Sequence, residues 1–190
     1  MDIISLSPSL QLLLAVLPIA LGAYSFFRGS EKLGLAMLFI GALVLRFVMA
    51  SLDPFLHDWD ERFHALVAKN MMDNPWVPML REHPVIPYNY KAWCCNHIWV
   101  HKQPLFMWQM AISMKLFGVN EVAMRLPSAV LGALGTLLVY RVGVLWLKEK
   151  GVAYFAALFW ALSYYQLELT SGREALDHND LVYGFYVLSS

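Results

Sequence analysis

The chain has 190 residues, of which 59% are hydrophobic and 15% are charged, and its formal net charge is zero. A soluble domain is about 45–50% apolar and about 25% charged, so this composition is typical of a membrane protein. The balanced charge gives no indication of a nucleic-acid partner. Asp2 stands where a cleavable secretion signal would carry basic residues, so we do not expect such a signal.

Four apolar runs are long enough to cross a bilayer, which takes about 20 residues. They cover 8–27, 33–52, 126–147 and 152–170, and a fifth run begins near Leu181 and is cut off at Ser190. We therefore predict an all-α fold, a polytopic transmembrane helical bundle that forms the N-terminal part of a longer protein. Its expected parts are two spans in 1–52, an outer loop with interfacial juxtamembrane helices in 53–125, and two further spans with the start of a fifth in 126–190.

The short basic connections RGSEK (28–32) and KEK (148–150) predict the orientation of the bundle. Such connections lie in the cytoplasm, which places 53–125 and 171–180 together on the outer face. This requires that 104–118 does not cross the membrane. That segment holds about 14 apolar-rich residues and Lys115, so we expect a re-entrant or interfacial helix. Arg46 lies near one end of its run, where we expect its side chain to snorkel to the interface.

The outer loop begins with an amphipathic pattern over 58–72. Phe63, Leu66, Val67 and Met71 recur at helical spacing opposite Arg62, Lys69 and Asn70, which predicts a helix in the headgroup plane. The following stretch is rich in proline and excludes a regular helix. Its tryptophans fit an interfacial belt: Trp76, Trp93 and Trp99.

Three carboxylates lie in the first turn of this predicted helix, on Asp58, Asp60 and Glu61. Acidic residues at this position cap the helix and complement its dipole, which explains one or two of them. Three could also supply a general base or a cation ligand. His57, Glu61 and His64 share one helical face and are weak candidates for a metal site, although the HExxH spacing is absent.

Cations and further acids follow in the predicted outer segments. Lys102 precedes the short helix at 104–118, and Arg125 lies at the start of the third span; either could bind a phosphate or anchor its helix. Arg173 and Asp177 belong to the charged stretch GREALDHND (172–180). This combination of carboxylates and scattered cations suits a substrate with an anionic headgroup and a lipid tail.

Two stretches carry a family resemblance. WDERFHALVAKNM resembles the acidic motif in the first outer loop of GT-C glycosyltransferases, and HKQPLFMWQMAISMKLFGVNEVAMRLPSAVLGALGTLLVY resembles the stretch that follows it. The pattern is similar to glycosyltransferase family 39, which includes the protein O-mannosyltransferases and the lipid A aminoarabinose transferases. It runs from about Asp58 to Asp180. Two helices precede the acidic loop here, whereas the family has one, and the family's chains are longer, so we expect this fragment to be inactive by itself.

The resemblance implies an integral membrane enzyme, in a bacterial inner membrane with its active face periplasmic. It would move a sugar from a polyprenyl-phosphate donor to an acceptor glycan, lipid or protein, with inversion. On this mapping Asp60 is the base and Glu61 supports it. Donor phosphate would lie near Lys102, Arg125, Arg173 and Asp177. No cofactor is certain, and a divalent metal stays open because family members differ in their metal dependence.

Two alternatives remain on the sequence. The chain could be a non-catalytic membrane subunit or a fragment of a transporter whose outer acidic site gates an ion or binds a partner. A transporter typically carries charges or broken helices at the bilayer midplane, whereas the charges here gather at the outer ends of the spans. The other alternative is an outer-face metalloprotein, which requires His57, Glu61 and His64 to converge.

Overall fold

The computed structural model describes residues 6–91, 96–173 and 178–190. Within these ranges the chain forms helices and no strand, apart from one isolated bridge between Met79 and Ile98, so the all-α prediction is confirmed. In chain order the helices are α1 (Pro8–Phe27), α2 (Glu31–Ser51), α3 (Asp60–Met71), α4 (Pro104–Phe117), α5 (Glu121–Leu147), α6 (Lys150–Leu162), α7 (Tyr164–Ser171) and α8 (His178–Ser189).

Three of the described helices are long and apolar enough to cross a membrane, at Ser9–Phe27, Glu31–Ser51 and Glu121–Leu147. They agree with the first three predicted runs. The third, α5, begins earlier than the predicted start at 126, because Asn120 caps its N-terminus: the Asn120 side chain accepts a hydrogen bond of 2.8 Å from the backbone N–H of Ala123.

The run at 152–170, which we predict to be one span, lies in two helices. The chain breaks at Ser163, whose extended backbone (φ −60°, ψ 119°) separates α6 from α7. The guanidinium of Arg46 lies at this break and donates to the carbonyls of Trp160 and Ala161, each at 3.2 Å. Arg46 is fully buried and does not snorkel, in contrast to our expectation. It supplies donors to carbonyls in the last turn of α6, of which that of Trp160 also accepts the backbone N–H of Ser163 at 3.4 Å.

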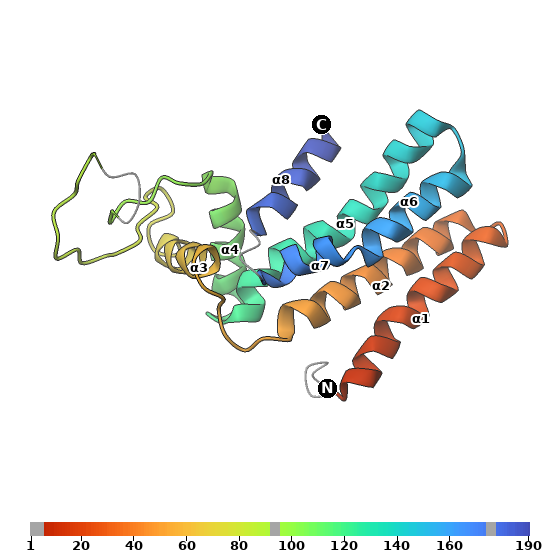
Figure 1. Cartoon of the computed structure of the whole chain (residues 1–190), viewed down its shortest axis with the longest axis horizontal. Helices are drawn as coiled ribbons and strands as arrows, with labels where there is room; N and C mark the ends of the chain where they lie inside the picture. The colour runs from red at the N-terminus through yellow and green to blue at the C-terminus, as the bar shows by residue number, and fades with distance from the viewer. Residues whose placement is uncertain (1–5, 92–95, 174–177) are drawn as a thin grey trace.

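The helices pack as a bundle in which α1 and α2 approach very closely (Figure 1). A Cβ atom on Gly34 would lie 2.9 Å from the carbonyl oxygen of Gly22, and one on Gly41 would lie 2.8 Å from that of Ala15. Small residues allow such backbone contact between membrane helices. The core between α1, α2, α5 and α6 is likewise rich in alanine.

The two ends of the bundle have different partners (Figure 1). At one end the α1–α2 and α5–α6 turns meet, where Lys150 pairs with Glu31 at 2.6 Å. At the other end lie α3, α4 and the start of α8, and here Arg173 pairs with Asp53 at 2.6 Å. The segments that we predicted to share one face therefore lie at one end of the bundle, while the direction in which this end faces stays a prediction.

The helices α3 and α4 are packed on a methionine-rich core at that end, with Met107, Met110 and Met124 fully buried. The buried face of α3 differs in part from our prediction. Leu66 is 42% exposed, and Asn70 is buried and donates to the carbonyl of Met79 at 2.8 Å.

The predicted tryptophan belt is divided in the structure. Trp76 is 81% exposed, as an interfacial residue would be, but Trp99 is 5% exposed and belongs to the core. Trp93 lies outside the described residues.

Candidate functional site

Glu61, in the first turn of α3, is the centre of a buried hydrogen-bond network and is only 2% exposed. Its Oε1 accepts from Arg125 Nε at 2.7 Å and contacts His178 Nε2 at 3.0 Å. Its Oε2 accepts from Arg125 NH2 at 3.2 Å, contacts His57 Nδ1 at 2.9 Å and accepts the backbone N–H of His57. One carboxylate thus ties α3 to α5, to α8 and to the preceding loop.

The surroundings of Glu61 favour its charged form. Burial alone would raise the pKa of this carboxyl, but the hydrogen bonds and charges of His178 and Arg125 outweigh it and lower the pKa to about 2. Glu61 is therefore ionised at neutral pH, and both of its oxygens are occupied by hydrogen-bond partners, so it is a poor acceptor for a substrate proton. Its contacts make it a structural anion.

Arg125 is fully buried and uses all five N–H groups of its guanidinium. Two of them bind Glu61, and the other three bind backbone carbonyls: NH1 donates to Ala50 at 2.9 Å and to Asp53 at 2.8 Å, and NH2 donates to Phe55 at 2.7 Å. Arg125 therefore fastens the end of α2 and the following loop to α5. No N–H group is left for the donor phosphate that the sequence assigned to it.

A second, more exposed group of charges adjoins the network. Asp53 accepts from Arg173 Nε at 2.6 Å and contacts His57 Nε2 at 3.2 Å, so His57 lies between two carboxylates. The hydrogen bond from Arg173 lowers the pKa of the Asp53 carboxyl. Arg173 is 31% exposed on its side chain, and its NH1 lies 4.0 Å from Glu168. Part of this guanidinium is thus open to a ligand.

Asp60 and Glu61 are adjacent but have opposite environments. Asp60 is half-buried, and its side chain makes no hydrogen bond or ion pair to any residue that the structure describes. It is the acid of this pair that can meet a substrate. Lys102 is half-buried in the loop directly before α4. Asp177, the remaining predicted acid, lies outside the described residues.

The metal candidates do not converge. His57 contacts Glu61, but the His64 ring packs between Trp99 and Phe106, with ring centroids 5.5 and 5.4 Å away. Among 6–91, 96–173 and 178–190 no group of three or more His, Cys, Asp or Glu side chains could hold a metal ion. The residues in these ranges therefore do not fit a metal.

Sequence reasoning missed two members of the network, Asp53 and His178. Asp53 directly follows an apolar run and looks like a helix stop, and His178 is one of several polar residues in GREALDHND. A signal did exist for the network itself, since Arg125 stands at the start of an apolar helix, where a buried arginine needs a carboxylate partner.

Part of the chain matches a known protein family. Residues 101–189 match the family model described as dolichyl-phosphate-mannose-protein mannosyltransferase, a stretch that contains Lys102, Arg125, Arg173 and His178. No curated protein and no solved structure matches the chain. Together with the apolar helices, the match supports a membrane glycosyltransferase that uses a polyprenyl-phosphate sugar. It confirms that the chain resembles the GT-C glycosyltransferases.

Proposed function

We propose that this chain is the part of a membrane glycosyltransferase that positions the acceptor, with Asp60 as the general base. The observation that carries the proposal is the contrast at the start of α3. Glu61 is buried and neutralised by Arg125, while the side chain of Asp60, the preceding residue, is half-exposed and has no partner among the described residues. The buried pair fixes the helix, and the half-exposed carboxylate of Asp60 is left accessible to a substrate.

The proposed reaction requires from the protein mainly a base for the acceptor hydroxyl and cations for the departing phosphate. The Asp60 carboxylate takes the proton of an acceptor hydroxyl while the hydroxyl oxygen attacks the anomeric carbon of the donor sugar. The bond from that carbon to the phosphate oxygen breaks, and the polyprenyl phosphate leaves with the electron pair. A single displacement of this kind inverts the anomeric centre. A positioned base contributes about 10²–10⁴-fold to the rate.

The departing phosphate requires cations, and Lys102 and Arg173 are the residues that we propose for it. Arg173 is part-exposed and lies at the same end of the bundle as Asp60. Arg125 has a positioning role in this proposal because its donors are occupied. Asp177 keeps its proposed place near the phosphate from the family pattern. The end that carries α3 and α4 would face the periplasm of a bacterial inner membrane, with a glycan, lipid or protein as acceptor.

The test is an assay of the full-length protein with a labelled polyprenyl-phosphate sugar. Asp60→Asn should lower the transfer rate by about 10²–10⁴-fold without a change in thermal stability. Asp58→Asn is the matched control, since its side chain lies just before α3, is 86% exposed and, among the described residues, pairs with Arg62. Equal rates in Asp60→Asn and wild type would remove Asp60 from the role of base.

A further inference from the structure

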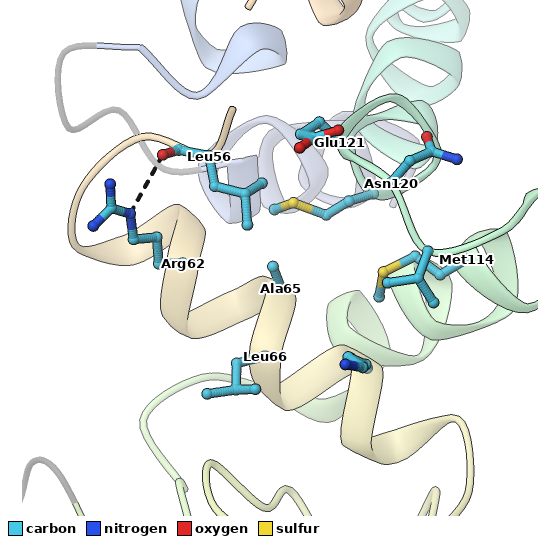
Figure 2. A pocket seen from close by; sticks show the side chains of 10 residues that line it. Leu56, Arg62, Ala65, Leu66, Met114, Asn120 and Glu121 are labelled. Carbon is cyan, nitrogen blue, oxygen red and sulfur yellow. Dashed lines mark hydrogen bonds between the residues drawn. The ribbon is translucent and has the colours of Figure 1, made fainter. Parts of the chain in front are cut away.

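A groove of about 220 Å³ lies between α3, the end of α4 and the start of α5 (Figure 2). Its floor is apolar and fully buried, formed by Met114 and Met124 with exposed fractions of 2% and 1%. Methionine side chains adapt their shape easily, so this floor suits a flexible apolar segment. Leu56 and Leu66 extend the apolar surface along the sides.

The walls of the groove carry opposite charges. Lys69 and Arg62 lie on the α3 side, and Glu121 lies on the α5 side. Neither the Lys69 nor the Glu121 side chain has a hydrogen bond or ion pair within the ranges that the structure describes. Arg62 uses NH2 for Asp58 at 2.9 Å and Nε for the carbonyl of Leu56 at 3.3 Å, and its NH1 makes no bond in the same ranges.

The position of the groove relates it to the membrane. Glu121 is the first residue of α5, which is apolar and long enough to span a bilayer. A groove at the end of such a helix lies where the lipid headgroups begin. Typical sites for a whole small molecule measure about 300–1,000 Å³, so this groove is too small for a complete sugar–lipid donor. It fits a smaller group with two opposite charges and an apolar continuation.

We propose that this groove binds the headgroup of a zwitterionic phospholipid with a primary ammonium. The phosphate would lie at Lys69, the ammonium at Glu121, and the first methylenes of the lipid over the two methionines. A carboxylate opposite the cations disfavours a purely anionic headgroup. The site would anchor α3 and α4 to the leaflet. This inference depends on the spanning helices and not on the proposed transfer reaction.

The test compares retained lipids by native mass spectrometry of the full-length protein, released from nanodiscs of phosphatidylethanolamine and phosphatidylglycerol with identical chains. Wild type should retain phosphatidylethanolamine about two- to five-fold over phosphatidylglycerol, the size expected for one exposed ion pair. Glu121→Gln should abolish this preference, and Lys69→Ala should lower the retention of both lipids.

Glu82→Gln and Lys91→Ala are the controls, since they remove exposed charges from the loop between α3 and α4 and should change neither value. A thermal melt of each variant shows that it is folded. Equal retention of the two lipids by wild type, a preference for phosphatidylglycerol, or an unchanged preference in Glu121→Gln would overturn the proposal.

Discussion

Replacing Arg125 with methionine should destabilise the protein far more than replacing an exposed arginine or lysine. The variant leaves Glu61 buried without its main partner and also removes the donors to three loop and helix-end carbonyls. Removing one member of a buried ion pair costs about 3–5 kcal/mol. The matched control is Lys150→Met, because its pair with Glu31 has side chains 63% and 39% exposed, and solvent screens such a pair.

The assay is thermal unfolding of both variants in the same detergent. A change of 1 kcal/mol shifts the melting temperature by about 2–4 °C for a chain of this size, so Arg125→Met should melt roughly 6–20 °C below wild type. The double variant Glu61→Gln/Arg125→Met should lose less than the sum of the two single variants, because it leaves no unpaired charge. A melting temperature for Arg125→Met that equals that of Lys150→Met would refute the reasoning.

Two further predictions concern the same network. The pKa of Glu61 is lowered from 4.5 to about 2 in the folded protein, so its contribution to stability is fully present above about pH 4.5 and is lost as the pH falls toward 2. The difference in melting temperature between wild type and Glu61→Gln should therefore narrow over that window. A constant difference would contradict this prediction. Gly172 has a positive φ of 68°, and a Cβ there would collide with His178 Nε2 and lie 2.8 Å from Glu61 Oε1. Gly172→Ala should lower the free energy of unfolding by more than about 1 kcal/mol, measured by thermal melting. Gly184→Ala, where a Cβ meets no atom within 4 Å, should be neutral or slightly stabilising. Equal effects of the two substitutions would count against the crowded network.

The helices could be predicted largely from local sequence. An apolar run of sufficient length predicts a helix whatever its neighbours are, and α1 and α2 match their predicted ranges within a few residues. The break at Ser163 could not be predicted in this way. The surrounding sequence WALSYYQLE contains no proline or glycine, and the break is stabilised by Arg46, which is more than a hundred positions earlier in the chain.

The site could be predicted as a region but not residue by residue. Charge distribution and family resemblance indicated α3 and the segment around Arg173, and the structure brings both to one end of the bundle. Adjacent residues on a helix point about 100° apart, so only the rotation of α3 distinguishes Asp60 from Glu61. That rotation depends on which side chains pack on Arg125 and on the core, and these contacts are all long-range.

The two buried arginines of this chain follow one physical rule, which the hydropathy of their helices conceals. Arg46 donates to the carbonyls at the end of α6, and Arg125 donates to a carbonyl in the last turn of α2 and to two in the loop after it. In both places a helix stops and leaves carbonyls that neither lipid nor apolar side chains can satisfy. Only Arg125 also has a carboxylate, Glu61, among the described residues. The negative end of the α6 dipole therefore serves Arg46 as its counter-charge. The break at Ser163 creates this helix end and so stabilises a buried arginine in α2.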